Sequence, residues 1–114
     1  MVSEQVRPEP KRFEVWQVAL DPTIGSEISK VRPCVVISPD QMNAVLATVI
    51  VAPLTSTHKR WPSRVVVEFG GRTGDIALDH IRSVDKQRLR RRLGTLDPAV
   101  AGEMLETLVT MFQA

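Results

Sequence analysis

Residues 48–69 read TVIVAPLTSTHKRWPSRVVVEF and contain two apolar runs separated by a polar loop. The runs at 48–54 and 64–69 are rich in valine, which favours extended backbone over helix. Gly70 and Gly71 follow the second run and supply residues that tolerate the positive φ angles of a tight hairpin turn. This stretch therefore predicts antiparallel strands.

The strand pattern extends to both sides of this stretch. Residues 13–20 alternate in two partly apolar rows, which predicts a strand with both faces partly covered. Pro33 lacks a ladder donor and restricts Arg32 to extended geometry, so we expect a buried strand to begin there and to run through 34–38. Residues 39–43 predict a short helical turn. One or two strands are expected at 74–85, and a cation-rich edge strand at 89–96.

The C-terminal residues follow a helical pattern. Asp97 suits an N-cap and Pro98 suits the first helical position. Apolar residues then recur every four positions in two neighbouring rows: Val100, Met104, Leu108 and Phe112, beside Ala101, Leu105 and Val109. We therefore predict an amphipathic helix at 98–112 that packs on a sheet. Short strands followed by one helix indicate a mainly β fold, a small curled antiparallel sheet or barrel.

Length and composition indicate one domain. The chain has 114 residues, 43% of them hydrophobic and 25% charged, as in ordinary globular proteins. We expect residues 1–12 to form a flexible tail and residues 13–114 the single domain. The sequence shows no secretory signal and no apolar run that could span a membrane. Cys34 is the single cysteine, which fits a reducing compartment, so we expect a cytoplasmic protein without membrane contact.

Metal or cofactor chemistry is not indicated. His58 and His80 are far apart, and one cysteine completes no zinc pattern. The aspartates at 75, 79 and 85 match no calcium loop, and no glycine-rich phosphate loop is present. Cys34 lies within an apolar strand, where a free cysteine is usually a small buried hydrophobe. We therefore expect no cofactor and no metal.

Two polar positions at strand ends attract attention. Arg32 lies where a loop meets a strand, and Thr55 begins a run of hydroxyl residues after another strand. A guanidinium beside hydroxyl donors suits a phosphate or a phosphorane-like transition state. The alternative is that Arg32 pairs with Glu27 or Asp21 on the surface. Spacing alone favours this alternative.

Three segments carry a resemblance to a known family. DPTIGSEISKVRPCVVISPDQMN, VIVAPLTS and ALDHIRSVDKQRL closely resemble the MazF/PemK toxin–antitoxin ribonucleases, over about residues 13–114. The resemblance implies a small SH3-like (PemK/CcdB-like) antiparallel barrel with a C-terminal α-helix, working as a homodimer. It also implies metal-independent, sequence-specific cleavage of single-stranded RNA, with neutralisation by a cognate antitoxin.

The resemblance implies catalytic roles for Arg32 and Thr55. Attack by the RNA 2′-hydroxyl would leave a 2′,3′-cyclic phosphate and a 5′-hydroxyl. The general base is open between Glu27, which we take as catalytic, and His58, for which an exposed loop position or an RNA contact is the favoured alternative. We expect His80 to be structural.

The remaining predictions concern RNA binding. Trp61 resembles a base-stacking platform among cations, and packing of its ring on the barrel is an equal alternative. The cations at 86–92 suit phosphates or an acidic antitoxin, or serve only solubility and edge protection. The predicted RNA contacts are Ser26, Ser56, His58, Lys59, Arg60, Trp61, Asp79 and Arg82.

The chain departs from the family pattern in places. Some members carry a histidine where this chain has Ser26 and an arginine where it has Ala77, and glutamine is common at the position of His80.

Two other classes of function compete with the ribonuclease hypothesis. One is a non-catalytic toxin of the same fold that inhibits a protein such as DNA gyrase, as CcdB does, although the C-terminal MFQA lacks the Trp-Gly-Ile-like tail of that group. The other is an inactive binding domain, or a small barrel with another RNA-binding role.

Overall fold

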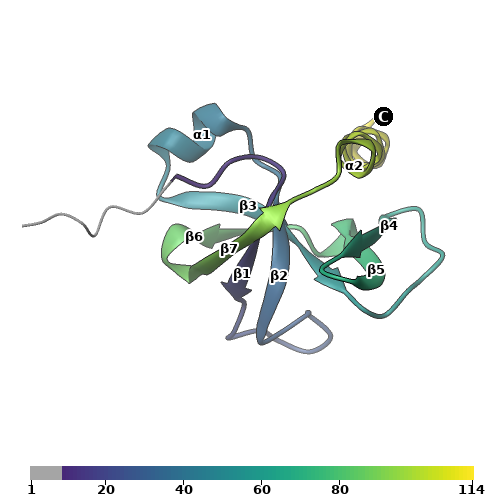
Figure 1. Cartoon of the computed structure of the whole chain (residues 1–114), viewed down its shortest axis with the longest axis horizontal. Helices are drawn as coiled ribbons and strands as arrows, with labels where there is room; N and C mark the ends of the chain where they lie inside the picture. The colour runs from purple at the N-terminus through teal and green to yellow at the C-terminus, as the bar shows by residue number, and fades with distance from the viewer. Residues whose placement is uncertain (1–8) are drawn as a thin grey trace, which may run out of the picture.

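A computed structural model describes residues 9–114 (Figure 1). In chain order the strands are β1 (Glu14–Ala19), β2 (Val31–Val36), β3 (Thr48–Thr55), β4 (Arg64–Phe69), β5 (Arg72–Ala77), β6 (Arg82–Asp85) and β7 (Leu89–Thr95). The α-helices are α1 (Asp40–Val45) and α2 (Pro98–Phe112), and two short 3₁₀ turns, η2 (Leu78–His80) and η3 (Lys86–Arg88), flank β6. The predicted mainly β fold with a C-terminal helix is confirmed.

Strand β3 connects two antiparallel sheets. The larger sheet has the order β7-β1-β2-β3-β6, and the smaller one consists of β4, β5 and the end of β3. Val51 to Pro53 pair with β2, whereas Leu54 and Thr55 pair with Ile76 and Asp75 of β5. Thr55 therefore lies where the chain leaves the larger sheet for the smaller one.

Two apolar clusters cover the two faces of the larger sheet. One includes Val15 of β1, the strands of the smaller sheet and Met104 of α2. The other includes Trp16 and Val18 of β1, with side chains from β2, β3, β6 and β7. The two apolar rows predicted for β1 thus lie in different clusters. This explains why both rows are apolar.

The helix α2 begins and ends as the sequence predicts. Its N-cap Asp97 accepts a hydrogen bond from the Ala99 backbone N–H at 3.1 Å. Ala101 and Met104 are buried against the core, and Figure 1 shows α2 close to β4. The apolar rows are only half covered, however, since Val109 and Phe112 near the C-terminus are exposed.

The hairpin turn between β4 and β5 is also confirmed. Gly70 and Gly71 have φ angles of 61° and 78°. Phe69 pairs with Arg72 across them, as in a two-residue turn that needs positive φ at both positions.

Strand β2 begins earlier than expected. It starts at Val31 and includes Arg32 and Pro33, because both pair with β1, opposite Val18 and Gln17. Its pairing with β3 begins only at Cys34. Pro33 therefore lies where β2 is paired on one side, and there its missing N–H is tolerated.

The N-terminal tail prediction falls partly outside the described residues, which begin at Glu9. Within the described part, the Arg12 backbone N–H donates to Asp40 Oδ1 at 2.8 Å, and Arg12 Nε donates to the Ile37 carbonyl at 2.7 Å. In residues 9–114 no helix is both long and apolar enough to cross a membrane.

Candidate active site

Arg32 and Thr55 line one cleft. Ten residues form its walls: Ser26, Glu27, Ile28, Ser29, Arg32, Thr55, Thr57, Trp61, Arg64 and His80. They come from the β1–β2 loop, β2, the end of β3 with the loop that follows it, β4 and η2. The structure thus brings together five predicted site residues, Ser26, Glu27, Arg32, Thr55 and Trp61.

The Arg32 guanidinium is held from one side. Its Nε donates to the Ser29 carbonyl at 3.1 Å, and Pro33 continues the extended backbone behind it. Within residues 9–114 it forms no ion pair. The two carboxylates considered as surface partners are engaged elsewhere: Asp21 Oδ1 accepts from the Lys30 amide and Glu27 Oε1 from the Ile24 amide. The terminal nitrogens of Arg32 are therefore available to an anion.

The position of Thr55 depends on close backbone packing. Thr55 Oγ1 accepts from the Thr57 backbone N–H at 3.2 Å, so its own hydroxyl hydrogen is free to donate. Gly74 of β5 lies against this residue, and a Cβ added there would be 2.2 Å from the Thr55 carbonyl oxygen. Only glycine allows β5 to approach Thr55 so closely.

A buried carboxylate holds the loop between β3 and β4. Asp75 lies opposite Thr55 in the sheet and is fully buried. Its Oδ1 is 2.7 Å from His58 Nδ1, and its Oδ2 accepts from the Lys59 backbone N–H at 2.8 Å. Arg64 Nη1 is 3.4 Å from Oδ2. Both ends of the loop are thus tied to one residue of β5.

The Arg64 guanidinium connects Asp75 with Asp79. Arg64 Nε donates to Asp79 Oδ1 at 2.7 Å. Burial alone would raise the pKa of each carboxyl. Hydrogen bonds outweigh this effect: His58 and Lys59 donate to Asp75, and Arg64 donates to Asp79. Both pKa values therefore fall below their ordinary range. The bond to Asp79 in turn raises the pKa of Arg64. All three groups are therefore ionised at neutral pH.

The Trp61 ring lies among cations. Arg64 Cζ is 4.8 Å and Lys59 Nζ is 5.5 Å from the ring centroid. The side chain is half exposed and lines the cleft. The ring belongs to neither apolar cluster, and a role in base stacking stays a prediction.

Other predicted residues lie beside the cleft. An adjoining cavity shares Ser26, Glu27 and His80 with it and adds Asp79 and Arg82. An apolar hollow on the other side shares only Arg32 and Thr55 with the cleft, and Ser56 lines that hollow together with side chains of β4 and β5.

Three predicted RNA contacts lie outside these cavities. His58, Lys59 and Arg60 are exposed and do not line the cleft, and His58 Nδ1 is engaged by Asp75. The structure therefore does not bring His58 to Thr55 as a base. His80, expected to be structural, lines the cleft, and its Nε2 lies 3.5 Å from Asp79 Oδ2.

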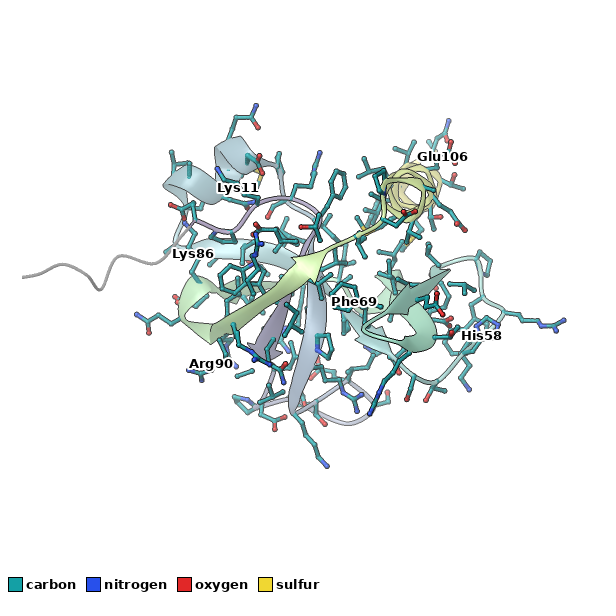
Figure 2. The ribbon with its side chains drawn as sticks, viewed as in Figure 1. Lys11, His58, Phe69, Lys86, Arg90 and Glu106 are labelled. Carbon is teal, nitrogen blue, oxygen red and sulfur yellow. The ribbon has the colours of Figure 1, made fainter. Side chains whose placement is uncertain are left out.

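The cations of β7 form a separate surface. Figure 2 shows Arg90 and His58 at opposite sides of the molecule. Part of this run is structural: Arg88 donates to the Ala19 and Asp21 carbonyls, and Arg92 pairs with Glu14 at 3.0 Å. β7 ends the strand order of the larger sheet, where its charges can protect the edge, and a contact with phosphates or an acidic antitoxin stays a prediction.

Cys34 takes no part in the cleft. Burial raises the pKa of its thiol to about 12, although Arg82 and Arg32 act in the opposite direction. The thiol stays protonated and unreactive at neutral pH, as expected of a buried hydrophobe.

The family is decided by comparison with known proteins. The profile described as "PemK-like, MazF-like toxin of type II toxin-antitoxin system" matches residues 11–112. The chain belongs to this toxin family. The Mycobacterium tuberculosis protein "Endoribonuclease MazF9" is 34% identical over 110 residues, covering 86% of this chain and 92% of that protein.

Solved structures of PemK/MazF toxins share the fold. MazF from Deinococcus radiodurans superposes with a TM-score of 0.83 at 26% identity, over 95% of this chain and all of that one. A mycobacterial endoribonuclease "in complex with its cognate antitoxin" has a TM-score of 0.76 at 25% identity, over 89% of this chain and 92% of that chain. The comparisons support the ribonuclease hypothesis rather than the gyrase-inhibitor alternative.

Three residues of the site in this PemK/MazF chain were not predicted from the sequence: Asp75, Arg64 and His80. An aspartate inside the apolar segment GDIAL signals a buried carboxylate that needs partners. His80 follows a buried strand end, the same signal that drew attention to Thr55. Arg64 lies where a polar loop meets a strand, the same signal that drew attention to Arg32.

We expect Asp75→Asn to destabilise the toxin by about 3 kcal/mol at pH 7, because it removes one partner of a buried ionic network. The folded-state pKa of Asp75 is lowered, so this stabilisation is present above the unfolded pKa of about 3.9 and is lost as pH falls through the folded pKa. Urea unfolding at a series of pH values measures both effects.

The control is Glu106→Gln on the exposed side of α2, which should change the free energy of unfolding by less than about 0.5 kcal/mol (Figure 2). If Asp75→Asn lowered the free energy of unfolding equally at pH 7 and at the lowest pH where the protein folds, the stabilisation would not come from the charge of Asp75.

Proposed function

We propose that this PemK/MazF-family toxin is an endoribonuclease that cuts single-stranded RNA at the cleft containing Arg32 and Thr55. The observation that carries the proposal is that Arg32 and Thr55 line the same cleft. The Arg32 guanidinium has no ion-pair partner within residues 9–114, and the Thr55 hydroxyl lies where the two sheets meet. The substrate supplies the nucleophile, its 2′-hydroxyl. The protein has to orient the phosphate and stabilise charge.

In this mechanism Arg32 holds the non-bridging phosphate oxygens. The planar fork of its terminal nitrogens matches two oxygens, and Thr55 adds a hydrogen bond as charge grows in the phosphorane. Glu27 takes the proton of the 2′-hydroxyl as the oxygen attacks phosphorus, through Oε2, since Oε1 accepts from the Ile24 backbone N–H. The bond from phosphorus to the 5′-oxygen breaks, and the products are a 2′,3′-cyclic phosphate and a 5′-hydroxyl.

RNA binding would extend along both sides of this pair. The cleft offers Trp61 for stacking and Ser26 for hydrogen bonding, whereas Ser56 borders the apolar hollow. Asp79 and Arg82 lie in the adjoining cavity, and Lys59 and Arg60 add positive charge at the exposed loop. His58 would serve as an outer contact rather than as the base.

We include a homodimer and a cognate antitoxin in the proposal. Val109 and Phe112 of α2 leave 64% and 72% of their surface exposed, so apolar surface of this helix is free for a second copy. A related endoribonuclease has been solved with its cognate antitoxin. We place the activity in the cytoplasm, where messenger RNA is available.

The decisive test is RNA cleavage in the presence of EDTA. We expect purified protein to cut a long RNA at discrete sites and to leave 5′-hydroxyl ends, because the 2′-hydroxyl attacks and no side-chain cluster suited to a metal exists within residues 9–114. Primer extension maps the sites, and 5′-labelling by polynucleotide kinase without prior phosphatase detects the ends.

Products that carry a 5′-phosphate would contradict the mechanism, since they require attack by water with a different leaving group. An absence of cleavage accompanied by gyrase inhibition would support the competing toxin class.

A further inference from the structure

His80 lies in the cleft and has no role in the mechanism so far. Its imidazole lines both the cleft and the adjoining cavity, in each case together with Ser26 and Glu27. The side chain is one-quarter exposed, so substrate can reach it while its position stays restricted. Its Nε2 is 3.5 Å from Asp79 Oδ2.

The turn that carries His80 is firmly anchored. Leu78, two residues earlier in η2, is fully buried, and its backbone N–H donates to the Ser63 carbonyl at 3.0 Å. Asp79, the intervening residue, is held by Arg64 Nε at 2.7 Å. The imidazole is therefore presented from a rigid element, as proton transfer requires.

None of the residues given a role so far can donate a proton to the leaving 5′-oxygen. Arginine retains its protons far above neutral pH, hydroxyl groups are weak acids, and a carboxylate serves as the base. Imidazole alone among the ionisable side chains lining the cleft ordinarily exchanges a proton between pH 5 and 8. Five charged groups share the two cavities with it: Glu27 of the loop, Arg32 of β2, Arg64 of β4, Asp79 of η2 and Arg82 of β6.

We propose that His80 is the general acid of the cleavage reaction, an inference that rests on the ribonuclease function proposed above. The 2′-oxygen forms a bond to phosphorus while its proton passes to Glu27. The bond from phosphorus to the 5′-oxygen breaks with its electron pair on oxygen, and the His80 imidazolium gives that oxygen a proton. Solvent then returns a proton to His80 and removes one from Glu27.

A change of leaving group tests this role directly. Two oligonucleotides are made around a mapped cleavage site, one with the natural 5′-oxygen and one with sulfur in its place at the scissile bond. Sulfur leaves as a stable thiolate and needs no proton. We expect His80→Gln to cut the oxygen substrate about 100-fold more slowly than wild-type protein and the sulfur substrate within about threefold of it.

Arg32→Lys is the matched control, because it weakens charge stabilisation and should be slow on both substrates. For each variant, the rate on the oxygen substrate is divided by the rate on the sulfur substrate. Because both rates come from the same preparation, a smaller fraction of folded protein does not change this ratio. The pH profile is a second readout: with the oxygen substrate, His80→Gln should lack the fall in rate that wild-type protein shows as the acid loses its proton at high pH.

Each outcome has one meaning. An equal loss on both substrates, or full activity of His80→Gln on the oxygen substrate, would overturn the role of His80 and leave the ribonuclease function standing. Wild-type protein that cuts neither substrate would overturn the ribonuclease function and the inference with it.

Discussion

Arg32→Lys is expected to slow RNA cleavage by about 100- to 1,000-fold, the usual cost of losing one well-placed donor to a charged transition state. Lysine keeps the charge but not the planar fork that meets two phosphate oxygens at once. The side chain forms no ion pair within residues 9–114, so the free energy of unfolding should change by less than about 1 kcal/mol. Single-turnover cleavage and thermal melting on the same preparation measure the two quantities.

Arg90→Lys provides the matched control. Arg90 is an exposed arginine of β7 on the side of the molecule away from His58, and it should keep both activity and stability (Figure 2). If Arg32 served only as a surface charge, Arg32→Ala would cut RNA as fast as wild-type protein does. That result would end the assignment of Arg32 as the phosphate-binding residue.

The second large effect is expected from the substrate. Replacing the ribose at the cleaved nucleotide by deoxyribose should abolish cleavage, because the nucleophile is then missing from the reaction. Binding should remain within about tenfold, since the proposed contacts of Arg32, Thr55 and Trp61, which line the cleft, are to the phosphate and the bases rather than to the nucleophile alone. Denaturing gels report cleavage, and fluorescence anisotropy of a labelled oligonucleotide reports binding.

A deoxyribose at the neighbouring nucleotide is the control, and that oligonucleotide should still be cut. Cleavage of the first oligonucleotide at the modified position would show that water or another external nucleophile attacks. The mechanism built on Arg32 and Glu27 would then be wrong, although the fold and the family would be unaffected.

Local chemistry made most of the fold predictable. The helix α2 begins after Asp97 because a side-chain cap and Pro98 act within one turn, and the β4–β5 hairpin turns at two glycines for a similarly local reason. Caps and turns of this kind depend on neighbouring residues only, so no long-range contact is needed to recognise them. Arg32 and Thr55 each stand at one end of an apolar run, but their catalytic roles were implied only by the resemblance to the MazF/PemK family.

The surroundings of Arg32 and Thr55 needed the tertiary structure. Asp75 reaches His58 and Lys59 because β5 pairs with the end of β3, twenty residues away in the chain. That pairing draws His58 away from the cleft, while the anchored turn η2 brings His80 into it.

The sequence by itself determined the strands and the helix, because these follow from periodicity, capping and turn residues, and the resemblance to the MazF/PemK family singled out Arg32 and Thr55. Only the tertiary structure decided which of the two histidines faces the cleft. The choice depends on strand register and on a buried carboxylate network, and both are properties of residues far apart in the chain.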